Sequence, residues 1–158
     1  MFRVGIGNDT HRLVAGRPFI LGGIRLECDV GPEGHSDGDA LTHALADAIL
    51  GALCEGDLGM HFPDTDPQWR DADSQQLLAR VCWLASERGF EVANVDATVM
   101  LERPRLRQHV DSMREMLAKT MGVGAGQVSI KAKTGEGLDA VGRGEAITVQ
   151  AIVLLAKK

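Results

Sequence analysis

The residues best suited to chemistry near the N-terminus are Asp9 and His11, which stand two positions apart. In an extended strand, residues two apart project to the same side, so this carboxylate and this imidazole can converge. Both groups are good Zn²⁺ ligands, and a catalytic zinc usually takes three protein ligands and keeps one open position. The same pair also fits a turn at a strand end, with an Asx hydrogen bond and a surface histidine. The spacing alone leaves both interpretations open.

A second cluster, residues 35–39 (His-Ser-Asp-Gly-Asp), precedes His43. Asp39, His43 and Asp47 follow at intervals of four, so they share one side of the helix expected here. The serine and the first aspartate of the cluster can cap that helix, whose N-terminus then favours a phosphate. His43 could also supply the third zinc ligand that the N-terminal pair lacks. The alternative is a capping cluster surrounded by solvated acids.

Two further regions, residues 57–66 and residues 131–145, combine acidic residues with glycines. Residues 57–59 (Asp-Leu-Gly) and 62–66 (Phe-Pro-Asp-Thr-Asp) could bind sugar hydroxyls, or could be solvated turns. Residues 131–137 and 142–145 offer glycines for close backbone approach, Thr and Arg for phosphate oxygens, and Glu for a hard cation such as Mg²⁺. The Walker pattern G-x-x-x-x-G-K-S/T is absent, and a plain hairpin is the alternative for this last segment.

Hydrophobic periodicity predicts the elements that must position these residues. Strands are expected at 2–8, 18–27, 91–101, 127–133 and 146–156. Gly22-Gly23 should form a turn or bulge in the second of these strands. Helices are expected at 37–55 with a stop at Gly56, at 73–89 with a capping box of Asp73 and Gln76, and from Pro104 onward. This β-β-α-α-β-α-β-β order predicts an α+β sandwich with helices on one face of a mixed sheet. The last strand is apolar on both faces near its end, which suits a central strand or a subunit interface.

Composition limits the classes of function. A chain of 158 residues with 44% hydrophobic and 25% charged residues suits one domain over 1–158. Its formal charge of −5 argues against a nucleic-acid partner, which needs a basic surplus. Three widely spaced cysteines, Cys28, Cys54 and Cys82, indicate buried thiols in a reducing, cytoplasmic compartment. We expect no membrane partner, because no apolar run approaches ~18 residues and no signal peptide is recognisable.

In this order and spacing, the motifs resemble those of the 2-C-methyl-D-erythritol 2,4-cyclodiphosphate synthases of the non-mevalonate isoprenoid pathway. The matching stretches are residues 5–11, 35–39 with His43, 56–59, 62–66 and 142–145. They span nearly the whole chain, and its length matches too. The resemblance implies a homotrimer of ferredoxin-like α+β subunits with active sites between neighbours.

The resemblance also implies roles for individual residues. Zinc would be held by Asp9, His11 and His43, and a second divalent ion, Mg²⁺ or Mn²⁺, by Glu136 and the diphosphate. The implied catalytic residues are His35 and Thr134, which would stabilise the pentavalent phosphorus. The substrate's phosphates and sugar would contact Asp9, Thr10, His11, His35, Ser36, Asp57, Leu58, Gly59, Phe62, Pro63, Asp64, Thr65 and Asp66. The nucleotide side would be formed by Leu101, Pro104, Arg105, Leu106, Arg107, Ala132, Lys133, Thr134, Gly135, Glu136 and Arg143.

The implied reaction is an intramolecular phosphoryl transfer. The 2-phosphate of 4-diphosphocytidyl-2-C-methyl-D-erythritol 2-phosphate attacks the β-phosphorus, expels CMP and closes a cyclic diphosphate. The nucleophile is already an anion, so the site needs charge neutralisation and an in-line pose rather than a strong base. This chain has Asp139-Ala140 where the family commonly has Gly-Phe, so an aromatic contact is lost there. A zinc-dependent phosphohydrolase and a non-catalytic, zinc-stabilised trimer are the alternative functions.

Overall fold

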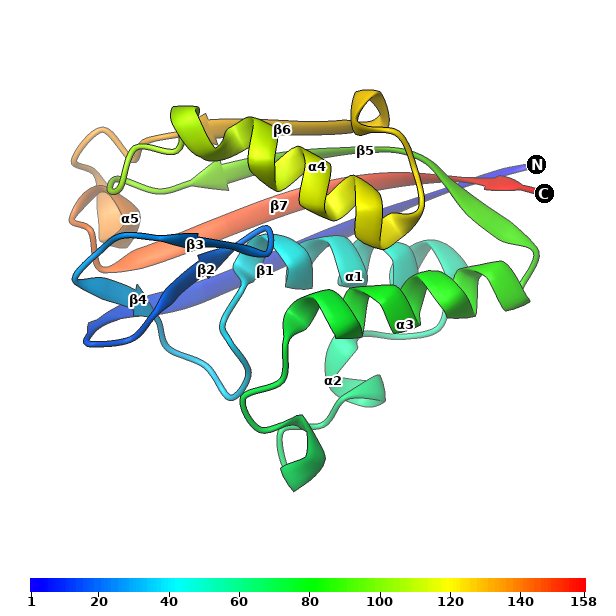
Figure 1. Cartoon of the computed structure of the whole chain (residues 1–158), viewed down its shortest axis with the longest axis horizontal. Coiled ribbons are helices and arrows are strands. Elements are labelled where there is room, and N and C mark those ends of the chain that lie inside the picture. Colours follow the sequence, from blue (N-terminus) through cyan, green and yellow to red (C-terminus); the bar gives the residue numbers. More distant parts are fainter.

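The computed structural model describes residues 1–158 and contains a five-stranded sheet with the strand order β4-β1-β7-β5-β6 (Figure 1). The strands are β1 (Phe2–Ala15), β4 (Val30–Pro32), β5 (Phe90–Met100), β6 (Val128–Lys133) and β7 (Ala146–Lys157), with β2 (Phe19–Leu21) and β3 (Ile24–Leu26) forming a separate hairpin. Only β5 and β6 run parallel; the other pairs are antiparallel. The expected mixed sheet is confirmed, and β7 is its central strand.

The helices form a layer on one face of this sheet (Figure 1). They are α1 (Ala40–Leu53), α3 (Ser74–Glu87) and α4 (Val110–Met121), with the short α2 (Leu58–His61) and α5 (Asp139–Gly142) in loops. Helix α1 lies against β1 and β7, and α3 contacts both α1 and α4. The expected α+β architecture with a helical layer on one face is therefore confirmed.

Two glycines in β1 let α1 approach the sheet closely. A Cβ atom on Gly5 would lie 1.9 Å from the carbonyl oxygen of Ala48, and one on Gly7 would lie 2.0 Å from that of Ala44. Only glycine fits at these two positions. Asp9 and His11 continue the same face of β1, so the close packing carries them to the N-terminal end of α1.

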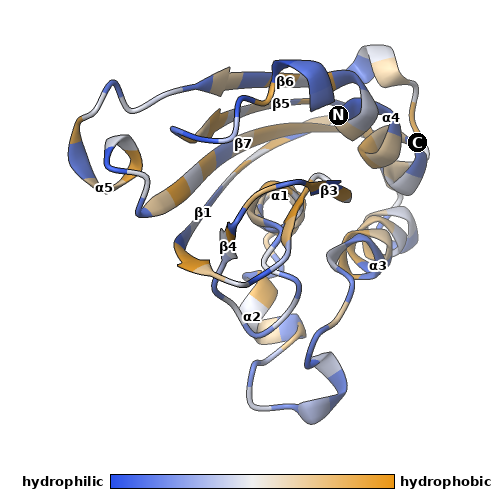
Figure 2. Cartoon of the chain, turned by 60° about the vertical axis from the view of Figure 1, so that its left-hand side comes forward, coloured by the Kyte–Doolittle hydropathy of each residue, from blue (hydrophilic) through white to orange (hydrophobic).

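The opposite face of β1 and β7 has no helix over it. Phe2, Val4 and Ile6 of β1 are 69%, 69% and 56% exposed, and Ile152 of β7, paired with Ile6, is 45% exposed. Figure 2 shows this part of the sheet as a hydrophobic stretch of β7 lying beside β1. We call these four residues the open apolar face. No helix in the chain has both the length and the apolar character needed to cross a bilayer.

Several element boundaries differ from the sequence expectations. Helix α1 ends at Leu53, earlier than expected, because Cys54 already takes the left-handed conformation, with φ of 62°, two residues before Gly56. The third long helix begins at Val110 rather than Pro104, because Leu101 and Leu106 are buried and hold the intervening segment against the core. The expected capping box at α3 is wrong, since the Asp73 side chain accepts from the Gln75 N–H. Residues 57–72, between the first two long helices, contain α2 and a 3₁₀ turn at Pro67–Trp69.

Asp39 is fully buried and holds the β2–β3 turn to the start of α1. Its Oδ1 accepts from the backbone N–H groups of Gly22 at 2.8 Å and Thr42 at 3.0 Å. Its Oδ2 accepts from the Gly23 N–H and the Thr42 hydroxyl, both at 2.7 Å. Four donors thus converge on one carboxylate, which explains why an acid is fully buried here.

Replacing Asp39 with asparagine should destabilise the fold by about 3 kcal/mol and lower the Tm by roughly 6–12 °C. The amide has the same shape, but its NH₂ group would face two of these donors. Thermal and urea denaturation would measure the loss, with Asp73→Asn at the exposed cap of α3 as the control. A loss no larger than that of the control would show that the carboxylate does not hold the hairpin.

Candidate metal centre and groove

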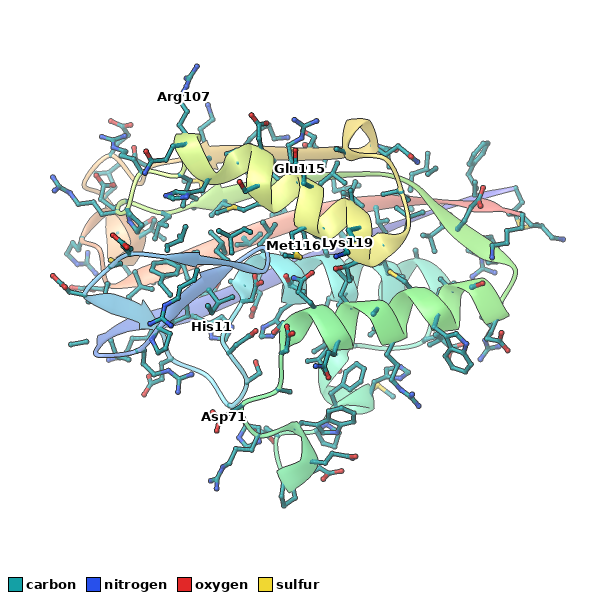
Figure 3. All side chains as sticks on the ribbon, viewed as in Figure 1. His11, Asp71, Arg107, Glu115, Met116 and Lys119 are labelled. Atoms are coloured by element: carbon teal, nitrogen blue, oxygen red, sulfur yellow. The ribbon has the colours of Figure 1, made fainter.

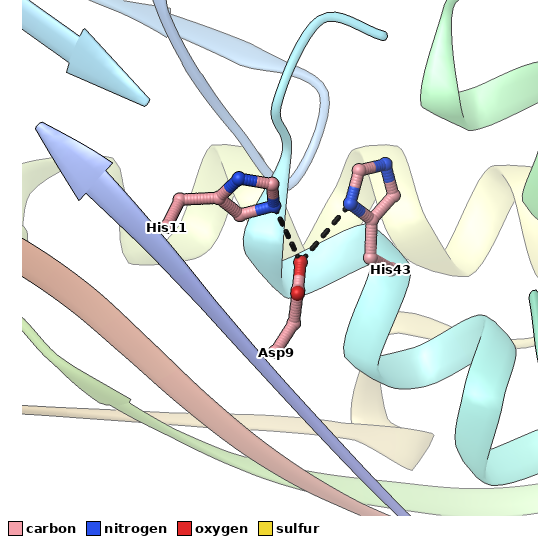
Figure 4. Close-up of side chains that lie close together, drawn as sticks. All are labelled: Asp9, His11 and His43. Atoms are coloured by element: carbon pink, nitrogen blue, oxygen red, sulfur yellow. Dashed lines mark hydrogen bonds and ion pairs between the residues drawn. The ribbon is translucent and has the colours of Figure 1, made fainter. Parts of the chain in front are cut away.

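Asp9, His11 and His43 form a compact cluster between β1 and α1 (Figure 4). Asp9 Oδ2 lies 2.8 Å from His11 Nε2 and 3.0 Å from His43 Nδ1. One ligand atom from each residue lies within 4.8 Å of the other two. The structure therefore brings together the carboxylate and the two imidazoles that the sequence offered as possible zinc ligands.

The outer nitrogen of each imidazole is already occupied. His11 Nδ1 lies 2.6 Å from the carbonyl oxygen of Glu33, which can only accept, so Nδ1 carries the proton and Nε2 faces Asp9. His43 Nε2 lies 2.8 Å from the hydroxyl of Ser74, which leaves Nδ1 facing Asp9. These outer contacts fix the rings with their inner nitrogens together. One carboxylate and two inward imidazole nitrogens fit a divalent metal with an open coordination position.

Without a metal, a proton must lie between Asp9 Oδ2 and His11 Nε2, because the two atoms are 2.8 Å apart and cannot both be bare acceptors. Burial alone raises the pKa of Asp9, but the hydrogen bonds from His11 and His43 outweigh it and lower that pKa to about 2. Burial alone lowers the pKa of His11, but the hydrogen bond and charge of Asp9 outweigh it and raise that pKa above 6.5. The arrangement therefore favours a positive charge on His11 beside the carboxylate.

We expect zinc affinity to fall as the pH drops through the raised pKa of His11, because a proton then competes for Nε2. In the metal-free protein, the same pKa shifts make the folding stability depend on pH. The stabilising His11–Asp9 pair is fully present below pH 6.5 and is lost as pH rises through the raised pKa of His11. The contribution of Asp9 is present above pH 3.8 and is lost as pH falls toward 2.

Urea unfolding between pH 6 and 9, with and without zinc, would measure both effects. The metal-free protein should lose stability across this range, and the stabilisation added by zinc should grow. An increase in stability of the metal-free protein with pH would show that the His11–Asp9 pair is not charged.

The loop before α1 carries His35 and brings Ser36 next to the cluster. Ser36 Oγ lies 3.2 Å from His43 Nε2, and the His35 side chain is exposed. Arg17 holds this loop by donating from Nη2 to the carbonyl oxygens of Gly34 and Ser36, both at 3.1 Å. No sequence signal marked Arg17 as a loop-holding residue, because its contacts depend on how the chain returns from the β2–β3 hairpin.

The other two acids on the α1 side do not join the cluster. Both carboxylate oxygens of Asp39 already accept hydrogen bonds, from three backbone N–H groups and one hydroxyl. Asp47 accepts from the Leu58 N–H at 2.7 Å and so fixes the start of α2. Burial, and then the nearby charge of Asp57, raise the pKa of Asp47. The helical spacing of these residues predicted a shared side, but only His43 reaches Asp9.

Residues 57–66 lie beyond the end of α1, around α2 (Figure 1). Asp57 caps α2 by accepting from the Met60 N–H at 3.0 Å, and Asp66 caps the following 3₁₀ turn. Phe62 is buried edge-on against Trp69, with ring centroids 5.0 Å apart. Asp64 and Thr65 are exposed, so their side chains are available to a ligand.

A separate groove of about 690 Å³ lies between β6 and the segment leading into α4. Of the residues expected on the nucleotide side, it is lined by Leu101, Pro104, Arg105, Leu106, Arg107, Ala132, Lys133, Thr134 and Glu136. Val110, Asp111 and Ile130 also line it and were not anticipated. Gly135 and Arg143 are not among the lining residues, and Arg143 instead makes a two-point contact with Glu145 at 3.0 and 3.1 Å.

The groove and the metal cluster are far apart within one chain. The sheet register places Thr10 opposite Thr148, Thr148 opposite Met100, and Met100 opposite Lys133. Three strand spacings therefore separate Thr10 from Lys133, which is about 14 Å. Figure 3 shows the same separation, with His11 beside β1 and Arg107 pointing outward beyond β6. The chain does not bring Thr134 or Glu136 to its own metal cluster.

Comparison with known proteins places the chain in a family. The model of the YgbB family matches residues 2–156. A curated 2-C-methyl-D-erythritol 2,4-cyclodiphosphate synthase from Thermosynechococcus vestitus is 57% identical over 153 residues, covering 97% of this chain and 95% of its own.

Two solved structures have the same fold. A 2C-methyl-D-erythritol-2,4-cyclodiphosphate synthase in a CDP-bound form is 39% identical, with a TM-score of 0.90 over 98% of this chain and 100% of its own. The bifunctional IspDF from Campylobacter jejuni is 37% identical, with a TM-score of 0.96 over 100% of this chain and 43% of its own. The chain belongs to the YgbB family, among the 2-C-methyl-D-erythritol 2,4-cyclodiphosphate synthases.

Proposed function

We propose that this chain converts 4-diphosphocytidyl-2-C-methyl-D-erythritol 2-phosphate into 2-C-methyl-D-erythritol 2,4-cyclodiphosphate and CMP, as a cyclising phosphorus–oxygen lyase of isoprenoid biosynthesis. The observation that carries this proposal is the convergence of Asp9, His11 and His43, in a chain so similar to curated synthases. The chemistry agrees with the site. An anionic phosphate nucleophile needs neutralisation and alignment rather than a strong base, and the cluster can supply both by holding a metal.

We assign the cluster to Zn²⁺, on the basis of its one carboxylate and two imidazole donors. When bound, the metal would act as a Lewis acid on a phosphate oxygen. Asp9 and the inward nitrogens of His11 and His43 would hold it. Ser36 borders the same position and His35 precedes it on the same loop, and we propose that the exposed His35 stabilises charge on the transferred phosphorus.

We assign the groove to the cytidine diphosphate part of the substrate. Support comes from its three basic side chains, Arg105, Arg107 and Lys133, and from the CDP-bound state of the solved synthase. Thr134 donates to Glu136 Oε1 at 2.7 Å, so the two side chains border one position at the groove. We propose that Thr134 contacts the diphosphate there and that Glu136 holds Mg²⁺ or Mn²⁺, which keep few protein ligands beside substrate phosphates. Arg143, exposed beside this loop, would reach a phosphate after leaving Glu145.

We propose a homotrimer of ferredoxin-like subunits, each a single domain over residues 1–158. The open apolar face supports this assembly, because Phe2, Val4, Ile6 and Ile152 offer a contiguous surface for burial in a symmetric contact. The sugar part of the substrate would then lie against Asp57, Gly59 and the 62–66 loop. The cysteine usage supports a cytoplasmic location.

Phosphorus NMR of the purified protein with the cytidyl substrate, Zn²⁺ and Mg²⁺ tests the proposal. We expect the signals of a cyclic diphosphate and CMP in equal amounts. Release of inorganic phosphate would instead identify a zinc-dependent phosphohydrolase. An unchanged substrate spectrum with a zinc-loaded protein would identify a non-catalytic trimer.

A further inference from the structure

Ser74, the first residue of α3, makes its contacts far from the groove and next to the metal cluster. Its side chain is fully buried, and its Oγ lies 2.8 Å from His43 Nε2. The residue belongs to an ordinary helix start, where Asp73 already caps the helix by accepting from Gln75. Capping therefore does not account for the burial of the Ser74 hydroxyl.

Asp37 determines where the Ser74 proton goes. Ser74 donates its hydroxyl proton to Asp37 Oδ1, and its backbone N–H donates to Asp37 Oδ2 at 3.0 Å. A carboxylate can only accept, so the single hydroxyl proton is committed to Asp37. The serine oxygen then presents only lone pairs to His43. His43 Nε2 must carry a proton in order to make this 2.8 Å bond, and the more distant Ser36 Oγ, at 3.2 Å, can accept from the same proton.

This fixes the tautomer of His43. A neutral imidazole has one protonated nitrogen, so once a metal replaces the proton between Nδ1 and Asp9, a proton on Nε2 leaves the Nδ1 lone pair facing the metal. That direction is the one a metal ligand requires. Because Ser74 is fully buried, water has no access to replace its hydroxyl.

The backbone strengthens the same arrangement. The Asp71 N–H donates to the His35 carbonyl at 3.0 Å, and the Asp37 N–H donates to the Ala72 carbonyl at 3.2 Å. Residues 71–74 are thus bonded to residues 35–37 by both backbone and side-chain contacts. The N-terminal end of α3 forms a support behind the metal cluster and the loop that carries His35.

We propose that Ser74, held by Asp37, is a positioning residue that sets the His43 tautomer and so raises the zinc affinity of the cluster. The proposal rests on the zinc assignment made above. Contacts of this kind typically change metal affinity by about 10- to 100-fold.

The test compares the zinc affinity of the parent, Ser74→Ala and Asp73→Ala, each measured by competition with a chelator. Asp73→Ala is the matched control, because it removes the cap of the same helix without touching His43. We expect Ser74→Ala to bind zinc about 10- to 100-fold more weakly and Asp73→Ala to bind it within about threefold of the parent. Equal affinity in all three proteins, or equal weakening in both variants, would overturn the proposal.

A second measurement needs no variant. Histidine ¹⁵N NMR of the zinc-loaded parent should show His43 with a proton on Nε2 and with metal on Nδ1. A proton on Nδ1 would overturn the proposal even if Ser74→Ala failed to fold. Phosphorus NMR on the same parent sample keeps the two proposals separate: a cyclising parent with the wrong His43 tautomer would refute only the role of Ser74.

Discussion

Replacing His43 with alanine is expected to remove most of the bound zinc and to lower kcat by at least about 1,000-fold, or about 4 kcal/mol in the barrier. His43 supplies one of three ligand atoms that lie within 4.8 Å of one another. The remaining Asp9 and His11 lie on one strand and approach the metal position from one side only. The hydrophobic core does not include His43, so the variant should remain folded.

Metal analysis of the dialysed protein, together with phosphorus NMR of turnover, would measure both effects. His61→Ala is the matched control, because His61 is also half-buried but bonds to the Glu55 carbonyl at 2.8 Å, away from the cluster. It should keep one zinc per chain. Full zinc content in His43→Ala would mean that the metal binds elsewhere, and full activity with no zinc would mean that the metal is not needed.

The second large effect is expected when two inactive variants are mixed. His43→Ala damages the metal cluster, and Thr134→Ala with Glu136→Ala damages the end of the groove. The sheet register keeps these two halves about 14 Å apart in one chain, whereas a diphosphate must touch both. In a cyclic trimer, one side of each chain meets the other side of its neighbour, so a neighbour can supply the missing half.

Co-refolding the two variants in equal amounts should therefore restore activity. Random mixing makes three quarters of the trimers mixed, and each mixed trimer contains one interface with two intact halves among three. The expected recovery is about one quarter of the parental activity. Native mass spectrometry would confirm that mixed trimers formed, and phosphorus NMR would measure turnover.

A second pair of variants controls for activity that returns through refolding alone. Mixing His43→Ala with Asp9→Ala, which damage the same half, should restore nothing. If mixed trimers of the first pair formed and stayed inactive, the two halves would have to act within one chain, and a large rearrangement would be needed to bring Thr134 to the cluster.

Much of the metal cluster is predictable from local sequence. Residues two apart in a strand share a face, which is enough to place Asp9 and His11 together. The apolar positions of residues 41–53 predict the helix that carries His43. Spacing alone does not identify the groove residues: the resemblance to the synthases supplies most of them, and Val110, Asp111 and Ile130 lie outside it.

Other features could not be predicted from spacing. Asp39 shares a helix side with His43 in sequence, yet four donors from the β2–β3 turn and from Thr42 occupy it. The boundaries also shifted where a buried side chain decided them, as Leu106 did before α4. In both cases a contact between elements outweighed the local pattern.

The sequence by itself predicted a strand over residues 2–8, which the structure extends through Asp9 and His11 to Ala15, and it predicted the helix that carries His43. These follow from backbone geometry over a few neighbouring residues. Only the tertiary structure decided that Gly5 and Gly7 seat α1 on β1, that Ser74 meets His43 from 31 positions away, and that the groove lies three strands from the metal cluster. Such contacts depend on which elements pack together, and packing is decided by the burial of whole faces rather than by local spacing.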